Sequence, residues 1–498
     1  MLASVDSAVL EGVDGRVVRV EVHVSTGLPG YTVVGLPDAA GRESRERVRA
    51  ALLSSGLAFP IKRVTVNLAP ASIRKAGSGL ELAIALALAS ADGGLPEGVL
   101  DRVAVLGELG LDGAVRPVAG TLALVDAVTR AGAECVIVPA ANAAEAALVP
   151  AIHVRNARSL GELLACLKGE APWPDPPDPI AEADDSADAD EPLDLADVHG
   201  LANARLALSA AAAGGHHLLL VGPPGVGKTM LARRLPTIMP ALERDAALEV
   251  TRIHSASGRS IVSTLQTRAP FRAPHHSASS VALVGGGNPR VRPGEITLAH
   301  RGALFLDELP EFPISVLEGL RQPLEERVVR ISRASGTLEF PADFLLIACA
   351  NPCPCGRKAL ECRCGDAQRL RYARRLSAPL LDRFDLRLRI DSTGTEAGES
   401  SEETRTRVCV AIERQTARLA GTRWRRNAHI PPGALQQLVP LPTEAHAAWL
   451  DACRLRRLTG RGAARVRRVA RTFADLGDHE IVTADDVMRA AWLREDVW

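Results

Sequence analysis

The sequence predicts a multidomain α/β protein that ends in a helical region, and three observations lead to this prediction. A chain of 498 residues is too long for a single hydrophobic core. Strand-like and helix-like runs alternate before residue 168 and again after residue 194, which is typical of layered α/β domains. The C-terminal part carries mainly helical periodicity. We therefore expect domains at 1–168, 194–392 and 393–498, with a linker at 169–193.

The first α/β region has alternating strand-like and helix-like runs. Strands are expected at 17–24, 63–67, 104–109 and 135–138, and helices at 43–54, 80–91 and 121–131. The segment VLGELGLDGAVRPVAG, followed by AGAECVIVP, resembles the proteolytic domain of Lon-type proteases. The resemblance implies a fold that is shared with a ribosomal-protein domain.

Proteolysis by Lon-type domains uses a serine and a lysine. Where the resemblance places the lysine, this chain has the apolar run 121–125, and Ser78 lies only near the expected nucleophile. A serine hydroxyl without a lysine base is a poor nucleophile. We therefore expect a Lon-like domain without peptidase activity.

The predicted linker is acidic and rich in proline. Between residues 170 and 194 the chain has ten acidic residues, six prolines and no Lys or Arg. Such a segment cannot bury enough apolar surface to fold by itself. A solvated tether is the simplest interpretation, and an acidic arm that competes with DNA for a basic channel is the alternative.

A nucleotide-binding pattern opens the second α/β region. The apolar run 216–221 leads into G-x-x-x-x-G-K-T, and a helical run, 230–235, follows. Glycines in this strand–loop–helix context let backbone N–H groups face phosphates at a helix N-terminus. We predict that the loop binds ATP, that the lysine neutralises phosphate oxygens and that the threonine binds Mg²⁺. The loop consists of Gly222, Pro223, Pro224, Gly225, Val226, Gly227, Lys228 and Thr229.

Two further strand ends complete the predicted ATP site. The apolar run 303–306 ends in Asp307 and Glu308, and the apolar run 344–350 ends in Asn351. We predict that Asp307 holds Mg²⁺, that Glu308 polarises the attacking water and that Asn351 orients it. A helix cap for the two acids and a turn position for Asn351 are the alternatives. The loop and the two acids are expected at adjacent strand ends.

Two arginines are candidates for contacts with nucleotide from other elements. Arg383 lies in LLDRFD, a context in which ring ATPases place an arginine that reaches the neighbouring subunit's site. A salt bridge to Asp382 or Asp385 is the alternative. Arg461 opens an arginine-rich helix and is predicted to contact nucleotide from the helical region, although a neighbouring arginine could hold that role. An arginine that acts between subunits requires an oligomer, and we expect a homo-hexamer.

Four of the nine cysteines form a cluster, C-x-C, six residues, then C-x-C. Clustered cysteines in a reducing compartment suggest a metal before a disulfide. Four thiolates suit tetrahedral Zn²⁺ and leave no ligand position open, so a zinc ion here would be structural. Free thiols are the alternative. The cluster consists of Cys353, Cys355, Cys362 and Cys364.

Three stretches, FRAPHHSASSVALVGGG, RPGEITLAHRGALFLDELPEF and ANPCPCG, strongly resemble the magnesium-chelatase-like AAA+ family, in its ComM/YifB branch. The resemblance covers nearly the whole chain and implies a Lon-like domain, an AAA+ P-loop domain and a helical lid. It also implies a hexameric DNA helicase that drives branch migration in homologous recombination, notably in natural transformation. Residues 197–201 depart from the Gly-Gln that the family commonly has there.

Several basic segments could contact DNA. Residues 327–338 predict a hairpin on which Arg330 and Arg333 would face phosphates, which dominate non-specific affinity. Pairing of these arginines with acids is the alternative, namely with Glu325, Glu326 or Glu339. Arg290 and Arg292 lie in an expected insertion at 288–295, and residues 369–375 begin a basic helix. His275 and His276 could contact DNA or substrate, or serve structural hydrogen bonds.

The composition and the N-terminal sequence limit the classes of function that we expect for this protein. The chain has 59 basic and 59 acidic residues, so its total charge indicates no partner. Its start, MLASVDSAVLEG, lacks the pattern of a secretory signal, and no uncharged apolar run reaches the ~18–20 residues of a membrane span. We expect a cytoplasmic protein without a membrane partner. A DNA-translocating motor is the favoured function, and a chelatase- or chaperone-like ATPase that remodels a protein partner is the alternative.

Overall fold

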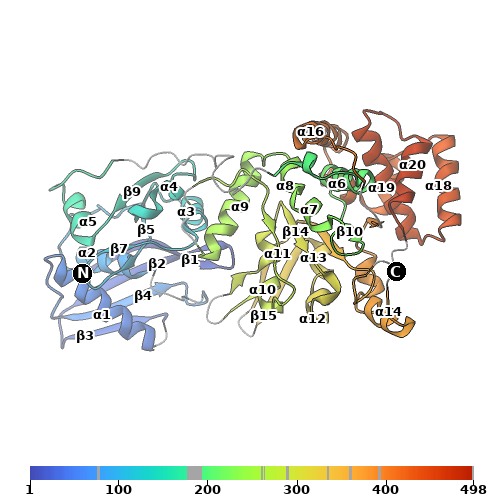
Figure 1. Cartoon of the computed structure of the whole chain (residues 1–498). Helices are drawn as coiled ribbons and strands as arrows, with labels where there is room; N and C mark the ends of the chain where they lie inside the picture. Colours follow the sequence, from blue (N-terminus) through green and yellow to red (C-terminus); the bar gives the residue numbers. More distant parts are fainter. Residues whose placement is uncertain are drawn as a thin grey trace.

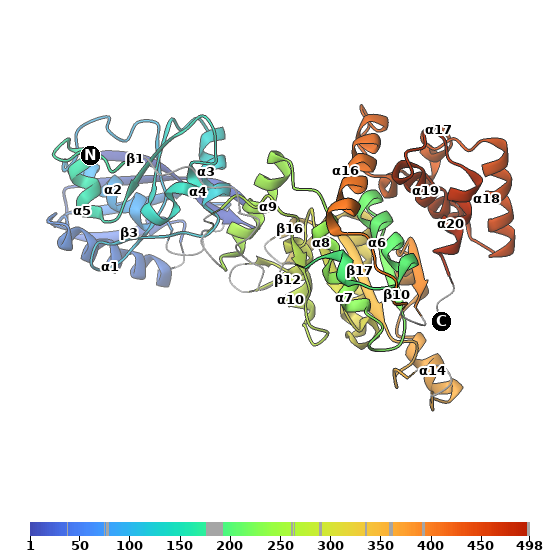
Figure 2. The same ribbon diagram turned by 45° about the horizontal axis from the view of Figure 1, so that its top comes forward.

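The computed structural model describes residues 1–36, 38–73, 75, 79–175, 193–259, 262, 264–287, 291–333, 336–357, 362–390 and 394–495. Figure 1 shows an N-terminal α/β region, a central region with a parallel sheet and a C-terminal helical region, one after another, and Figure 2 shows the same order from a second direction. The predicted mixed α/β class with a helical C-terminal region is confirmed. Most of the predicted linker lies outside the described residues.

The N-terminal region is built on a mixed seven-stranded sheet. Its strand order is β3-β4-β2-β1-β5-β8-β9. β1 and β2 form a long antiparallel hairpin, whereas β5, β8 and β9 run parallel. The strands are β1 (Leu2–Glu11), β2 (Asp14–Ser25), β3 (Gly30–Val34), β4 (Arg63–Ala69), β5 (Val103–Val105), β8 (Cys135–Pro139) and β9 (His153–Ala157), with a small hairpin of β6 (Glu108–Leu109) and β7 (Val115–Arg116).

Helices cover both faces of this sheet. Alternate valines of β2 point to one face and are buried there with α1, α2 and α5, as the two-residue period of a strand requires. α3 and α4 pack on the opposite face. The helices are α1 (Asp38–Ser54), α2 (Glu81–Ala91), α3 (Thr121–Arg130), α4 (Ala143–Ala146) and α5 (Leu160–Leu167), with the 3₁₀ turn η1 (Ala140–Asn142).

The central region contains a five-stranded parallel sheet in the order β11-β14-β17-β10-β18. Alternate residues of β10 enter two different cores, so both faces of the sheet are covered. The carboxyl ends of all five strands meet at one edge, which is where ligands bind in open α/β sheets. The strands are β10 (Leu218–Val221), β11 (Phe271–Arg272), β14 (Ala303–Leu306), β17 (Leu345–Ala350) and β18 (Leu386–Arg389).

Short helices and two hairpins surround the central sheet. The predicted hairpin at 327–338 is confirmed as β15 (Val328–Arg333) with β16 (Gly336–Pro341), and a second one pairs β12 (Gly285–Gly286) with β13 (Arg292–Pro293). The helical elements are η2 (Leu195–Asp197), α6 (Ala202–Gly214), α7 (Lys228–Arg233), α8 (Leu235–Ile238), α9 (Arg244–Ser257), α10 (Ser280–Val284), α11 (Glu295–Leu298), η3 (Leu309–Glu311), α12 (Ile314–Gly319), α13 (Arg321–Glu326), α14 (Asp366–Ala373) and α15 (Ala378–Leu381).

Helix α9 joins the N-terminal region to the central region, as Figure 1 shows. Arg252 on α9 lies 3.8 Å from both Asp14 and Asp126. Ser255 on the same helix donates a hydrogen bond to the buried carboxylate of Glu145. The two regions are therefore held together by side chains that lie far apart in the sequence.

The C-terminal region is a helical bundle against α6. Helix α16 starts at a capping box, in which Ser400 accepts from the backbone of Glu403 and the Glu403 side chain accepts from Ser400. Buried Asp475 holds the bundle through 2.8 Å ion pairs with Arg418 and Arg471. The elements are α16 (Ser401–Arg418), η5 (Asn427–His429), η6 (Pro432–Ala434), α17 (Leu435–Leu438), α18 (Thr443–Leu455), α19 (Gly460–Leu476) and α20 (Ala484–Trp492). Among the described residues, no helix has the length and apolar character that crossing a membrane requires.

Candidate nucleotide site

The glycine-rich loop joins β10 to α7 at the carboxyl edge of the central sheet. Gly225 and Gly227 have φ angles of 82° and 86°, a left-handed conformation that favours glycine. Gly222 packs so closely on the chain that an added Cβ would lie 2.4 Å from the carbonyl oxygen of Ile390. The Gly222 N–H also donates to the Ala350 carbonyl at 3.1 Å, which fixes the start of the loop against β17.

Lys228 begins α7 and is buried beneath the loop. Its Nζ donates to the carbonyl oxygens of Gly222 at 2.7 Å and Pro223 at 2.9 Å, and to Asn351 Oδ1 at 3.3 Å. Burial lowers the pKa of the Lys228 amine, and the charges of Asp307 and Glu308 act in the opposite direction. The cationic end of the side chain is therefore held inside the curve of the loop.

Thr229 and Asp307 lie in direct contact. The Thr229 hydroxyl donates to Asp307 Oδ2 at 2.7 Å. A hydroxyl and a carboxylate are hard oxygen donors of the kind that Mg²⁺ takes. Their contact brings together the two residues that the sequence assigns to this ion, so the donor set fits it.

The strand ends at the site are arranged differently from the sequence prediction. β14, which carries Asp307 and Glu308, was expected to end adjacent to the loop, but β17 lies between β10 and β14. The prediction of adjacent strand ends is therefore wrong. The intervening strand places Asn351 between the loop and the two acids.

The predicted phosphate-binding and water-activating groups, except Gly222, Pro223 and Val226, border one pocket of about 420 Å³. Val226, which the sequence includes in the loop, instead points into the core below it. Glu308 has a φ angle of 52°, which turns the chain sharply after the strand. The pocket is bordered by Pro224, Gly225, Gly227, Lys228, Thr229, Met230, Asp307, Glu308, Ala350 and Asn351.

The sequence did not connect His276 with this site. Its Nδ1 lies 3.2 Å from Glu308 Oε2. A signal for the contact exists in the strand register, because Arg272 of β11 pairs with Leu304 of β14. Counting four residues onward along both chains sets His276 opposite Glu308. Finding it requires knowing that these two strands are neighbours.

The four clustered cysteines converge directly beside the nucleotide pocket. Their sulfur atoms all lie within 4.8 Å of one another, and Cys353 Sγ is 3.3 Å from Cys355 Sγ and 3.4 Å from Cys362 Sγ. Four sulfurs at this spacing fit tetrahedral thiolate coordination. A Cβ added to Gly356 would lie 3.3 Å from Pro224, so the cysteine loop packs on the phosphate loop.

Comparison with known proteins gives matches along most of the chain. Residues 194–397 match the family described as magnesium chelatase, subunit ChlI; residues 20–142 match subunit ChlI of Mg-chelatase, and residues 398–494 match its C-terminal part. An uncharacterized protein of Mycobacterium tuberculosis is 44% identical, with 98% of both chains covered. Uncharacterized protein YifB of Escherichia coli is 40% identical, over 97% of this chain and 95% of that protein. Competence protein ComM of Haemophilus influenzae is 39% identical, over 96% and 95%.

The chain belongs to the magnesium-chelatase-like ComM/YifB family. The resemblance predicted from the three sequence stretches is therefore confirmed. Membership in this family supports an ATPase of the AAA+ class.

In this ComM/YifB family member, Arg383 and Arg461 lie away from the phosphate loop. Both border a larger cavity at the opposite edge of the central sheet. Arg383 donates to Glu325 Oε2 at 2.6 Å, instead of pairing with Asp382 or Asp385. Arg461 is exposed at the start of α19. Within one chain, the structure therefore brings neither arginine to the nucleotide pocket.

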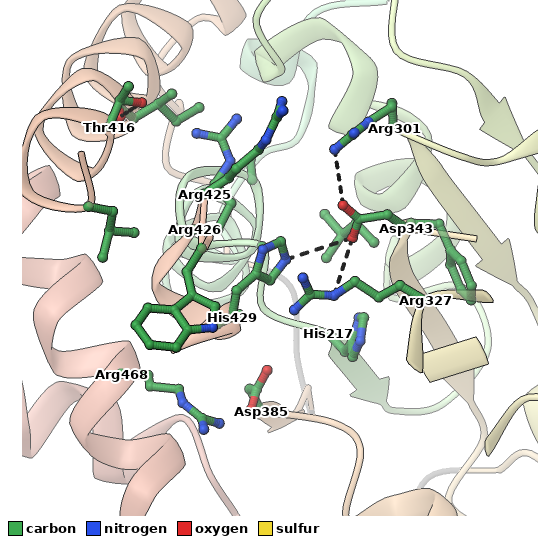
Figure 3. Close-up of a pocket in the computed structure, with 18 of the residues that line it drawn as sticks. His217, Arg301, Arg327, Asp343, Asp385, Thr416, Arg425, Arg426, His429 and Arg468 are labelled. Atoms are coloured by element: carbon green, nitrogen blue, oxygen red, sulfur yellow. Dashed lines mark hydrogen bonds and ion pairs between the residues drawn. The ribbon is translucent and has the colours of Figure 1, made fainter. Parts of the chain in front are cut away.

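Figure 3 shows this larger cavity, of about 980 Å³, between the sheet and the helical region. Asp343 lies at its centre, 3.2 Å from Arg301 Nη1, 3.5 Å from Arg327 Nε and 3.8 Å from His429 Nε2. Burial lowers the pKa of His429 to about 3, so its imidazole is neutral at pH 7. The Asp343 carboxylate is therefore balanced by the two arginines, and the network joins the central sheet to the helical region.

The candidate DNA residues lie on or near the two hairpins. Arg330 pairs with Glu339 at 2.6 Å and with Glu326, so the salt-bridge alternative describes this structure. Arg333 donates to the Gly287 carbonyl and thereby ties the tip of β15 to the other hairpin. Arg292 is exposed on β13, while Arg290 lies outside the described residues. The prediction that a basic helix starts at 369 is wrong, because α14 already begins at Asp366, and residues 369–375 form its later part and the turn that follows.

Proposed function

We propose that this chain is an AAA+ ATPase that couples ATP hydrolysis to translocation along DNA, with branch migration in homologous recombination as its process. One observation carries the proposal: the groups needed to bind and hydrolyse ATP border one pocket, and the same region of the chain has two hairpins that carry arginines. Family membership supports the ATPase part. Similarity to a protein named for competence supports the DNA part. We place this activity in the cytoplasm.

The proposed chemistry assigns one task to each group at the pocket. Lys228 neutralises phosphate oxygens, and Thr229 with Asp307 holds Mg²⁺, which supplies further positive charge at the phosphates. Glu308 accepts hydrogen bonding from the attacking water and polarises it. Asn351, 3.3 Å from Lys228 Nζ, orients that water. The sharp turn at Glu308 supports its task, because it brings the side chain to the pocket.

We propose a homo-hexameric ring. Arg383 and Arg461 border the edge of the sheet opposite the phosphate loop, so in a ring each would face the pocket of a neighbouring subunit. In that position Arg383 would act as the arginine that stabilises transition-state charge, and Arg461 would contact the same nucleotide. The 2.6 Å hydrogen bond from Arg383 to Glu325 would then be replaced by a contact between Arg383 and a phosphate.

The domain roles follow from the same proposal. Residues 1–168 form a Lon-like domain without peptidase activity, 169–193 a tether, 194–392 the AAA+ motor and 393–498 the helical lid. The docking of α9 on the N-terminal domain supports a role for that domain as part of the motor body. Ser78, the nearest candidate nucleophile, lies outside the described residues.

DNA contact is proposed at the hairpins, through Arg330, Arg333 and Arg292, and through Arg290 in the same insertion. The carboxylates that hold Arg330 are exposed, and exposed ion pairs in water contribute little. A DNA phosphate can therefore replace them without a large cost. The tie between Arg333 and Gly287 supports joint movement of the two hairpins.

Forked DNA is expected to stimulate ATP hydrolysis by the full-length protein more than linear duplex of equal length.

Replacing Arg330 and Arg333 together by alanine should weaken DNA binding and lower the salt dependence of that binding, because each lost phosphate contact reduces the slope of log K against log salt by about 0.9. Exchange of Arg102, an exposed arginine of the N-terminal region paired with Glu134, is the matched control.

The alternative function is that of a chelatase- or chaperone-like ATPase that remodels a protein partner. It is favoured by the magnesium-chelatase description of all three matched segments. The same ATPase assay separates the two functions. If neither forked nor linear DNA changes ATP turnover, whereas a protein partner does, the DNA proposal fails and the remodelling function replaces it.

We also propose that the four cysteines hold structural Zn²⁺, which stiffens the chain between Asn351 and α14. Protein purified under reducing conditions should contain about one zinc per chain, since four thiolates bind the ion tightly at neutral pH. Metal analysis of Cys362→Ser should show a large loss of zinc, and Cys453→Ser, outside the cluster, should keep it. If the parent protein contained less than a tenth of an equivalent of zinc, the zinc proposal would fail and the four cysteines would be free thiols.

A further inference from the structure

The turn between β1 and β2 is buried, although hairpin turns usually lie at the surface of a protein. Gly12 and Val13 form this two-residue turn, in which Gly12 has a φ angle of 70° and Glu11 pairs with Asp14. Val13 is only 3% exposed, at a position where glycine or a small polar residue is usual. Another part of the molecule therefore covers the turn.

The central region supplies this cover. Val13 lies in a buried cluster whose other buried members all come from the central region, between Leu219 and Phe384. A Cβ added to Gly12 would lie 3.5 Å from the ring of Phe340 on β16. Figures 1 and 2 both show the β1–β2 end of the N-terminal sheet facing the central region. The N-terminal region thus inserts this turn into the hydrophobic core of the central region.

Phe340 belongs to the base of the β15–β16 hairpin. It pairs with Val329 across the hairpin, and the two side chains are 0% and 1% exposed. Among the described residues of β15 and β16, no other is buried, and Arg330 is exposed. The β1–β2 turn therefore packs against the pair of residues by which the hairpin is attached to the core.

Contacts with α9 fix the turn in place. Arg252 of α9 lies 3.8 Å from the carboxylate of Asp14, the residue that follows the turn. At the end of the same helix, a Cβ added to Gly258 would lie 3.3 Å from the Cβ of Ala119 in the N-terminal region. The turn therefore cannot move away from Phe340 unless these contacts are also broken.

The base of the hairpin also leads to the nucleotide pocket. Only residues 342–344 separate β16 from β17, and Asn351 follows the carboxyl end of β17. Asn351 borders the pocket and lies 3.3 Å from Lys228 Nζ. A displacement of the exposed arginines can reach this strand only if the base of the hairpin is held firmly, because a loosely held hairpin would move by itself.

We propose that Val13 is a positioning residue through which the N-terminal region holds the base of the β15–β16 hairpin, and that this hold is required for DNA to stimulate the ATPase. The part that concerns stimulation rests on the proposed function. The part that concerns the hold is measurable without DNA or ATP.

Hydrogen exchange of the full-length protein, followed by mass spectrometry without DNA, tests the hold. Val13→Ala removes two methyl groups from the buried turn and leaves a small cavity beside the hairpin. The amides of residues 328–341 are expected to exchange about five- to thirtyfold faster than in the parent, because local opening becomes less costly. The amides of β10, in the centre of the parallel sheet, should keep the parental rate.

Val5→Ala is the matched control for this variant. Val5 is also 3% exposed and lies on the same strand, β1, but it is buried in the core of the N-terminal region. Exchange of residues 328–341 should stay at the parental rate in this control. Equal acceleration in both variants would overturn the proposal, since the general stability of the N-terminal region would then be responsible. Unchanged exchange in Val13→Ala would overturn it too.

ATP turnover with and without forked DNA tests the second part. Val13→Ala is expected to reduce the stimulation by DNA about two- to tenfold. Its kcat and its KM for ATP without DNA should equal those of the parent, because Val13 does not border the nucleotide pocket. Val5→Ala should keep the full stimulation.

The outcomes also distinguish this inference from the proposed function. If DNA stimulates Val13→Ala as strongly as the parent, or if Val13→Ala loses the same factor of turnover without DNA, the inference fails and the motor function stands. If DNA does not stimulate the parent, the proposed function fails together with the second part of the inference, and hydrogen exchange still decides whether Val13 holds the hairpin.

Discussion

Replacing Lys228 by alanine is expected to abolish ATP turnover, with a fall of about 10²–10³-fold or more, the range seen when one preorganised electrostatic contact is lost. Lys228 is the cation held beneath the phosphate loop, by carbonyl oxygens at 2.7 and 2.9 Å. ATP brings several negative charges to this place, and among the described residues that border the pocket no other side chain is a cation. Phosphate release measured at saturating ATP, together with binding of a fluorescent ATP analogue, checks both effects.

The matched control for this variant is Arg233→Ala. Arg233 lies in the last turn of the same helix, α7, is exposed and does not border the pocket. It removes one positive charge from the same element, so it should retain parental turnover. Comparable losses in both variants would mean that the charge of the helix matters and not the position of Lys228, and the assigned phosphate site would be wrong.

Replacing Glu308 by glutamine is expected to leave ATP binding intact and to lower hydrolysis by about 10²–10⁴-fold, the typical share of a general base. The amide has nearly the same shape as the carboxylate but cannot accept the proton of water. Thr229 and Asp307 keep their 2.7 Å contact, because Glu308 takes no part in it. The variant should therefore accumulate bound ATP, which nucleotide extraction and chromatography would measure.

Glu311→Gln provides the comparison. Glu311 is exposed in η3, three residues beyond Glu308, and does not border the pocket. The neutralisation is the same and the position differs, so turnover should stay at the parental level. Rapid hydrolysis by Glu308→Gln would rule out Glu308 as the group that activates water.

The parts of the site that the sequence predicted are those that one short segment encodes. The strand, loop and helix from β10 to α7 are contiguous, so their glycines, lysine and threonine need no distant partner to be recognised. The hairpin of β15 and β16 is equally local. Glu308 and Asn351 could be chosen as candidates because each follows an apolar strand, since the carboxyl ends of parallel strands share one edge.

Order among the strands decided what the sequence left open. Apolar runs indicate that strands are present. Strands that are buried on both faces have similar, continuously apolar sequences, so these sequences do not give the order of the strands in the sheet. The sequence of β17 does not indicate that this strand lies between β10 and β14. That order sets Asn351 between the phosphate loop and the acids, and it makes β11 the neighbour that brings His276 to Glu308.

The tertiary structure also determines which partners the charged side chains pair with. Arg383 pairs with Glu325, 58 residues away, although two aspartates stand beside it in the chain. Arg461 lies across the sheet from the nucleotide pocket of its own chain. Local sequence determined the helices, the loop chemistry and the family, because these depend on neighbours along the chain. The tertiary structure alone determined which charges meet, because such contacts depend on how separate elements pack.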